Sequence, residues 1–140
     1  MKILITGATG FAGGYLLRYL SNIYGIENVH GTGRSLSKAK ILSDEGFTIK
    51  VGDLVDPEFV NSQLTSYDLV VHCAAKSSVW GSYDSFYKAN VVATKNLLEV
   101  IHGEQQLIYI STANIYFNFL NRRSICEDDP LPNVINNHYA

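Results

Sequence analysis

The apolar positions of this chain fall into five short runs, separated by longer segments in which apolar residues recur with helical spacing. Read as strands, the runs cover residues 1–5, 29–33, 47–51, 68–75 and 107–111. The run 68–75 is apolar almost throughout, which is typical of a strand covered on both faces. Strands that alternate with helices predict an α/β fold with a parallel sheet and crossover helices.

The segments between the runs carry helix start and stop signals. Residues 11–24 predict a helix that ends at Gly25, a residue suited to a C-terminal cap. The apolar positions of that helix are Ala12, Leu16, Tyr19 and Ile23. A second helix spans 35–45, with Ser35 or Ser37 as its cap. Asp56-Pro57-Glu58 places a capping carboxylate, a first-turn proline and an acid at the start of a third helix, and a long fourth helix spans 82–102.

Composition narrows the class of protein. The length of 140 residues predicts one domain over 1–140, and 46% hydrophobic and 17% charged residues are ordinary for a globular protein. The net charge of −2 gives no reason to expect nucleic acid or an anionic membrane as a partner. No signal peptide and no membrane-length apolar stretch is visible, so we expect a cytoplasmic protein. The two cysteines, Cys73 and Cys126, make neither a disulfide framework nor a metal motif, and we expect Cys73 to be a small buried hydrophobe.

The stretch T-G-A-T-G-F-A-G-G, residues 6–14, joins the first strand to the first helix. In a dinucleotide-binding turn, the glycine at Gly7 allows a tight bend, Gly10 lets the backbone approach a pyrophosphate, and Gly13 lets helix and strand pack closely. The N–H groups and dipole of the helix start at Phe11 favour phosphate charge, and Thr9 lies within the turn. The alternative is a tight strand–helix turn without a ligand, which the spacing G-x-x-G-x-x-G alone leaves open.

This stretch resembles the signature of the extended short-chain dehydrogenase/reductase family. Four further stretches resemble motifs of that family, in the family's order: G-D-L at 52–54, H-C-A-A at 72–75, Y-K-A-N-V-V-A-T-K-N-L-L-E at 87–99 and Y-I-S-T-A-N-I-Y at 109–116. The chain is most similar to the N-terminal part of the epimerase/dehydratase and 3β-hydroxysteroid-dehydrogenase-like branch. The resemblance implies a Rossmann-like doubly wound sheet in the order 3-2-1-4-5, truncated before the last strands and the substrate lobe.

The resemblance also implies a site for NAD or NADP. It places an acid, Asp53, near the adenine and the H-C-A-A stretch beside the cofactor. The implied cofactor-binding residues are Gly7, Thr9, Gly10, Phe11, Gly13, Arg34, Asp53, Leu54, Ala74 and Ala75. NAD-binding proteins usually place an acid at the end of the second strand, where this chain has Gly33 and Arg34. Glu27 precedes that strand and should lie at its wrong end, so we expect NADP to be modestly preferred.

Thr112 and Tyr139 are the catalytic candidates that the resemblance implies. Carbonyl–alcohol interconversion needs an acid or base at the substrate oxygen and a second donor to hold that oxygen. A tyrosine with a pKa near 10 is a poor base without a neighbouring cation. In the family that cation is a lysine four residues beyond the tyrosine, a position that lies past Ala140. Ser111 competes with Thr112, and an ordinary tyrosine is the alternative for Tyr139.

Several motif residues also have structural interpretations. Asp53 can cap a loop, and His72 in an apolar strand reads as a core histidine with satisfied hydrogen bonds. Asn90 lies on an apolar helix stripe, and in the family such an asparagine ties the helix to the neighbouring strand. A second stripe on the 82–102 helix suggests contacts beyond its own sheet, and the resemblance implies a homodimer through this helix. The second stripe consists of Tyr87, Val91, Thr94, Leu98 and Ile101.

Three functional hypotheses follow. The first is an NAD(P)-dependent oxidoreductase or epimerase/dehydratase that acts on an alcohol or carbonyl of a sugar nucleotide or steroid-like small molecule. The second is a non-catalytic NAD(P)-binding module, and the third is an inactive remnant of a truncated gene. Thr112 and Tyr139 favour the first hypothesis, while the missing lysine position favours the others for the chain as written. No metal site is expected.

Overall fold

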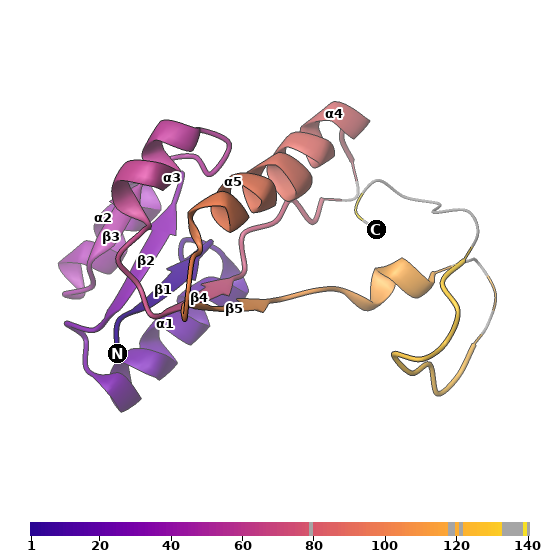
Figure 1. The fold of residues 1–140 in the computed structure, drawn as a ribbon, viewed down its shortest axis with the longest axis horizontal. Coiled ribbons are helices and arrows are strands. Elements are labelled where there is room, and N and C mark those ends of the chain that lie inside the picture. Colours follow the sequence, from indigo (N-terminus) through magenta and orange to yellow (C-terminus); the bar gives the residue numbers. More distant parts are fainter. Residues whose placement is uncertain (79, 118–119, 121, 133–138, 140) are drawn as a thin grey trace.

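The computed structural model describes residues 1–78, 80–117, 120, 122–132 and 139. These residues form one five-stranded sheet in the order β3-β2-β1-β4-β5, and every neighbouring pair is parallel (Figure 1). The strands are β1 (Ile3–Thr6), β2 (Val29–Gly33), β3 (Ile49–Val51), β4 (Leu69–His72) and β5 (Gln106–Tyr109). The predicted doubly wound sheet and its strand order are therefore confirmed.

Helices cover both faces of the sheet. They are α1 (Phe11–Tyr24), α2 (Leu36–Asp44), α3 (Pro57–Gln63), α4 (Tyr83–Phe86), the π-helical η1 (Tyr87–Val92), α5 (Ala93–Val100) and the short 3₁₀ helix η2 (Ala113–Tyr116). The core cluster around Leu17 and Leu42 lies beneath α1 and α2, whereas the cluster around Val60 and Leu97 lies beneath α3 and α5. After β5 the chain runs away from the sheet to η2 (Figure 1).

The residues predicted to cap the helices do so in the structure. The Asp56 carboxylate accepts a hydrogen bond from the Glu58 N–H at 2.9 Å, and Ser35 accepts from the Lys38 N–H at 3.4 Å. Gly25 ends α1 with φ of 89°, a conformation that glycine adopts without strain. β4 ends three residues earlier than predicted, because the N–H groups of Cys73 and Ala74 bond the Thr6 hydroxyl.

The face that α1 buries is not the stripe of apolar residues Ala12, Leu16, Tyr19 and Ile23. Its buried residues are Gly13, Gly14, Leu17 and Ser21, whereas Tyr19 and Ile23 are 52% and 56% exposed. The cause is the glycine turn. A Cβ on Gly13 would lie 2.3 Å from the Gly7 carbonyl oxygen, so the helix turns its smallest residues toward the sheet. This contact leaves the aromatic residues of α1 on the outer face.

The predicted long helix is interrupted by a π-helical turn. The Ala93 N–H bonds the Lys88 carbonyl, five residues back, rather than a carbonyl four residues back. Thr94, which we expected on the second stripe, is half-buried and donates its hydroxyl hydrogen to the Asn90 carbonyl at 2.6 Å. Apolar periodicity does not signal one extra residue in a turn, so this feature could not be predicted from the apolar pattern.

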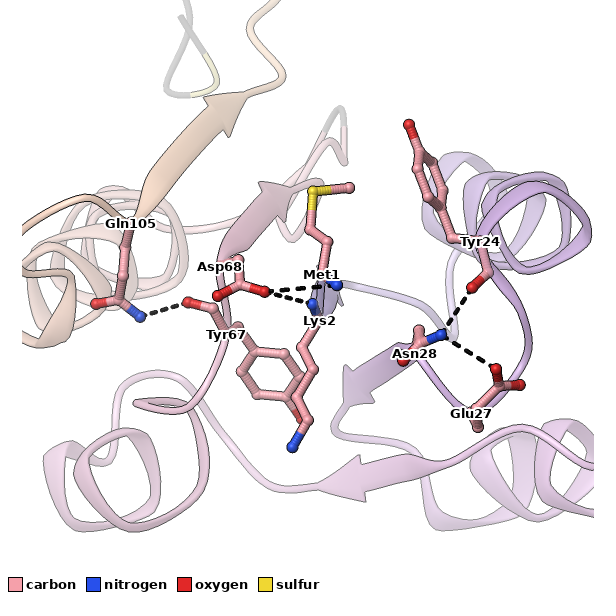
Figure 2. Close-up of polar contacts among 8 residues, drawn as sticks. All are labelled: Met1, Lys2, Tyr24, Glu27, Asn28, Tyr67, Asp68 and Gln105. Carbon is pink, nitrogen blue, oxygen red and sulfur yellow. Dashed lines mark hydrogen bonds and ion pairs between the residues drawn. The ribbon is translucent and has the colours of Figure 1, made fainter.

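Polar contacts hold the amino-terminal edge of the sheet, opposite the glycine turn (Figure 2). The Lys2 N–H donates to Asp68 at 2.6 Å, and the Gln105 amide donates to the Tyr67 carbonyl. Asn28 donates to the Tyr24 carbonyl and to Glu27. Glu27 therefore lies at this edge, as predicted, and not at the end of β2 where a cofactor ribose would bind.

Gly13→Ala should lower the free energy of unfolding by about 2 kcal/mol, because the added methyl group overlaps the Gly7 carbonyl. Gly10→Ala is the matched control, since its Cβ would lie 3.2 Å from the same oxygen and its φ is −96°. Urea unfolding of both variants measures the difference. Equal losses in the two variants would show that the Gly7–Gly13 contact is not specific.

Candidate functional site

A cleft of about 330 Å³ lies at the carboxyl ends of β1 to β4. In a doubly wound sheet this is the position where the strand order reverses and where ligands bind. The cleft is lined by small, polar and cationic residues: Gly7, Thr9, Gly10, Thr32, Gly33, Arg34, Ser35, Lys38, Gly52, Asp53, Leu54, Cys73, Ala74, Ala75, Ala89 and Ala93. The loops after β1, β2, β3 and β4, the end of β2, the first turn of α2 and the helical segment η1–α5 thus contribute to a single concave surface.

The glycine turn brings β1 against the segment that follows β4. Gly7 has φ of 68°, and a Cβ there would lie 2.8 Å from the Ala74 Cα. Both conformation and space therefore require glycine at this position. Gly10 is different, because its φ of −96° suits any residue and its Cβ would meet only the Gly7 carbonyl, at 3.2 Å. Gly10 is thus constrained by one close backbone contact rather than by its conformation, and it lies on the wall of the cleft.

The floor of the cleft is held by Thr6 and His72. The Thr6 hydroxyl accepts hydrogen bonds from the N–H groups of Cys73 at 3.2 Å and Ala74 at 3.1 Å. His72 Nδ1 lies 2.6 Å from that hydroxyl, and Nε2 lies 3.0 Å from the hydroxyl of Thr94. Burial lowers the pKa of His72 to about 4, so the ring is neutral at pH 7. The prediction of a core histidine with satisfied hydrogen bonds is confirmed.

The helical wall is fixed to the loop after β4 by Asn90. Its side chain accepts from the Lys76 N–H at 2.7 Å and donates to the Lys76 carbonyl at 3.2 Å. This two-way bond confirms the predicted structural role of Asn90. It also presents Ala89 and Ala93 to the cleft, where their small side chains leave space.

Cations gather at the end of the cleft formed by β2 and β3. Arg34 Nη1 lies 3.7 Å from the Asp53 carboxylate, and this exposed pair contributes little to stability. Asp53 also accepts from the Val55 N–H at 3.1 Å, so its loop-capping interpretation holds as well. Ser35 and Lys38 line the same end. Sequence reasoning missed both, although their position just after Arg34, in the first turn of α2, was a usable signal.

The structure gathers most of the implied cofactor residues at this cleft. Gly7, Thr9, Gly10, Arg34, Asp53, Leu54, Ala74 and Ala75 all line it. Gly13 packs behind the turn, and the Phe11 side chain is 98% exposed, outside the cleft lining. Cys73, expected to be fully buried, is half-buried and lines the cleft, where burial raises the pKa of its thiol.

The two catalytic candidates do not line the cleft. The Thr112 hydroxyl accepts from the Asn114 N–H at 3.3 Å and so caps η2, while its neighbour Ser111 is exposed. Tyr139 lies in a turn and is half-buried. Their catalytic roles remain predictions.

Searches of the described ranges found neither a cluster of three or more His, Cys, Asp or Glu suited to a metal ion nor a helix able to cross a membrane.

The buried neutral His72 should make stability depend on pH. Its pKa falls from 6.5 to about 4 on folding, so below pH 6.5 the unfolded chain binds a proton that the folded chain does not. Stability is therefore complete above pH 6.5 and falls as the pH drops toward 4. Between pH 7 and 4.5 we expect a loss of roughly 2 to 3 kcal/mol from this residue.

Urea unfolding of wild type and His72→Gln across this pH range measures the effect, since the variant lacks the titrating ring. Burial also lowers the pKa of His30, but that contribution is common to both proteins. Parallel pH profiles for the two proteins would contradict a neutral, buried His72.

Comparison with known proteins places this cleft in context. The profile of the NAD dependent epimerase/dehydratase family matches residues 3–140. The chain is 38% identical over 118 residues to the 2-alkyl-3-oxoalkanoate reductase of Stenotrophomonas maltophilia, covering 82% of this chain and 34% of that protein. It is 37% identical over 134 residues to the uncharacterized protein YbjS of Escherichia coli, covering 91% and 39% of the two chains.

Among solved structures, the UDP-glucuronic acid 4-epimerase from Bacillus cereus in complex with NAD superposes with a TM-score of 0.77 and 28% identity. That superposition covers 99% of this chain and 47% of the epimerase. The chain thus spans less than half the length of each of these three proteins. The family match over residues 3–140, with a glycine turn, a parallel sheet and a cleft at the reversal of strand order, shows that the chain belongs to the NAD-dependent epimerase/dehydratase family.

Proposed function

We propose that this chain forms the NAD(P)-binding part of an oxidoreductase or epimerase/dehydratase that acts on an alcohol or carbonyl group. The observation that carries the proposal is Gly10, a residue on the cleft wall whose missing side chain neither backbone conformation nor close packing fully explains. The start of α1 directly follows it, and the N–H groups of a helix start favour phosphate. The residues present therefore fit a dinucleotide.

The chain offers distinct surfaces to the parts of such a cofactor. The backbone of Gly7 to Gly13 would hold the pyrophosphate. The adenosine would lie between Arg34 and Asp53, near Leu54. Ala74 and Ala75 would lie beside the nicotinamide end, where small side chains allow close approach. When bound, the nicotinamide supplies hydride transfer; the protein binds and orients it.

NADP is the cofactor that the charges favour. Arg34 and Lys38 are two cations at the end of the cleft proposed for the adenosine, and Ser35 adds a hydroxyl. Asp53 is the acid at this end, and it lies 3.7 Å from Arg34. A 2′-phosphate would find two cations there, whereas an acid directed at free ribose hydroxyls is missing from the end of β2.

Thr112 and Tyr139 are proposed to handle the proton. Tyr139 would give or take a proton at the substrate oxygen, and Thr112 would donate a hydrogen bond to the same oxygen.

The names of two similar proteins support a proposal for the class of substrate. One is named a 2-alkyl-3-oxoalkanoate reductase and the other a UDP-glucuronic acid 4-epimerase. Both names describe chemistry at a carbonyl or alcohol carbon. A sugar nucleotide or a steroid-like apolar alcohol or ketone is accordingly the proposed substrate. A homodimer through residues 82–102 is also proposed, because Tyr87 and Leu98 on that helix are exposed, at 37% and 51%.

Gly10→Val should abolish dinucleotide binding while the fold survives. The φ of Gly10 accommodates valine, but the branched side chain would block the approach of a pyrophosphate to the backbone. Calorimetric titration with NADP⁺ and NAD⁺ measures binding, and circular dichroism checks the fold. Wild-type affinity in a folded Gly10→Val chain would refute the proposed cofactor site.

Arg34→Ala should weaken binding of NADP⁺ more than binding of NAD⁺. Loss of one charge-assisted hydrogen bond corresponds to about 1.5 to 3 kcal/mol, or roughly 10- to 150-fold in the dissociation constant. The matched control is Arg18→Ala, since Arg18 is paired with Glu45 away from the cleft. If Arg34→Ala weakens both cofactors equally, the case for NADP disappears.

Tyr139→Phe should reduce turnover about 10²- to 10⁴-fold in any active protein that contains this chain, because it removes the acid–base group. Cofactor affinity should not change, since Tyr139 does not line the cleft. Thr112→Val should also reduce turnover, and Ser111→Ala is its control. Products must be analysed as well as nicotinamide absorbance, because an epimerase regenerates its cofactor. Full turnover by Tyr139→Phe would exclude this tyrosine as the base.

A further inference from the structure

A buried chain of hydrogen bonds joins the long helix to the floor of the cleft, and its donors can be assigned one by one. At the helix end, Thr94 donates its only hydroxyl hydrogen to the Asn90 carbonyl at 2.6 Å. The Thr94 oxygen can then only accept from His72 Nε2, 3.0 Å away. The helix end therefore requires a hydrogen on Nε2 of His72.

The hydrogen bonds at Thr6, on the sheet, independently indicate the same tautomer of His72. The Thr6 oxygen accepts hydrogen bonds from the N–H groups of Cys73 and Ala74, which engages both of its lone pairs. Its own hydrogen must then point to His72 Nδ1, 2.6 Å away. Nδ1 is consequently an acceptor without a hydrogen. His72 is 1% exposed, so water cannot substitute for a lost partner.

One end of this series of hydrogen bonds lies at the π-helical turn, and the other end lies at the cleft. Thr94 lies one residue after the irregular bond between Ala93 and Lys88. Cys73 and Ala74 line the cleft, and the backbone of Ala74 lies against Gly7 so closely that a Cβ there would be 2.8 Å away. Thr94 itself does not line the cleft. Its neighbour Ala93 does line it, but the hydrogen bonds that lead from Thr94 to the Cys73 and Ala74 amides run through His72.

We propose that His72, held as the Nε2–H tautomer, is a positioning residue that couples the π-helical turn to the floor of the dinucleotide cleft. The tautomer and the amide positions stand on geometry alone. Only the consequence for cofactor affinity rests on the proposed function. His72 does not touch the ligand in this account; it sets the Thr6 hydroxyl that orients two backbone amides.

The tautomer is tested by two-bond ¹H–¹⁵N correlation of the histidine rings at pH 7. We expect His72 to show a hydrogen on Nε2 and none on Nδ1. An Nδ1–H tautomer or a charged ring would overturn the proposal. This measurement uses the wild-type chain, so it remains decisive even where a variant of a buried residue fails to fold.

The coupling is tested with Thr94→Val, which removes the acceptor and keeps the shape. Amide hydrogen exchange at Cys73 and Ala74 should become about three- to tenfold faster, the effect of losing one hydrogen bond, and NADP⁺ affinity should fall by a similar factor. Thr94→Ser keeps the hydroxyl, so its amide exchange rates and its NADP⁺ affinity should stay close to those of the wild type. In a His72→Asn background the link to Thr94 is already broken, so Thr94→Val should add nothing.

His30→Asn is the matched control. This histidine is also partly buried and bonds the Tyr67 hydroxyl at 2.9 Å, but it lies at the opposite edge of the sheet. Its replacement should leave the Cys73 and Ala74 amides and the affinity unchanged. Unchanged amides in Thr94→Val, or additive effects with His72→Asn, would overturn the coupling. If exchange behaves as expected while no dinucleotide binds, the coupling stands and the proposed function fails.

Discussion

The contact of Gly7 with two other backbone segments sets the geometry on which the cleft depends. A Cβ on Gly13 would overlap the Gly7 carbonyl, and a Cβ on Gly7 would overlap the backbone of Ala74. The end of β1, the start of α1 and the loop after β4, which is distant in sequence, thus meet with no side chain between them. Because the start of α1 is held this close to β1 and to the end of β4, the helix N-terminus faces the cleft. The buried face of α1 follows from this contact.

The two ends of the cleft differ in their electrostatics. Arg34 and Lys38 make the end at β2 cationic, and both side chains are exposed. The floor at β4 is uncharged, because burial keeps His72 neutral and Cys73 protonated at pH 7. A charged phosphate is thereby favoured at one end, and a flat ring that is neutral in its reduced form at the other. This division agrees with the chemistry of a nicotinamide dinucleotide.

Much of the fold and part of the site could be predicted from the sequence. The run before T-G-A-T-G and the capping signals at Ser35 and Asp56 depend on local chemistry, and local chemistry is visible in a single sequence. The buried face of α1 could not be read from apolar spacing, because it depends on the Gly7–Gly13 contact. The π-helical turn at Lys88 to Ala93 was missed for a related reason, since the hydroxyl of Thr94 and the ring of His72 stabilise it through tertiary contacts.

For the site, the glycine trio indicated the cleft, whereas Ser35 and Lys38 were missed although they follow Arg34 closely in sequence. The role of Thr6 could not be foreseen either, because its partners, Cys73 and Ala74, lie 67 and 68 residues along the chain. Thr112 and Tyr139 rest on resemblance alone, since neither lines the cleft. A single sequence therefore does not reveal which side chains and backbone groups, distant along the chain, come into contact across the sheet.

The central claim is that this cleft binds a nicotinamide dinucleotide. Titration of the ¹⁵N-labelled chain with NADP⁺, followed by amide chemical shifts, tests it most directly. The account predicts saturable shifts for Gly7 to Gly13 and for the amides of Arg34, Asp53 and Ala74. The amides of the opposite edge, around Asp68 and Asn28 (Figure 2), should not move. No shifts at millimolar NADP⁺, or shifts confined to that opposite edge, would contradict the claim.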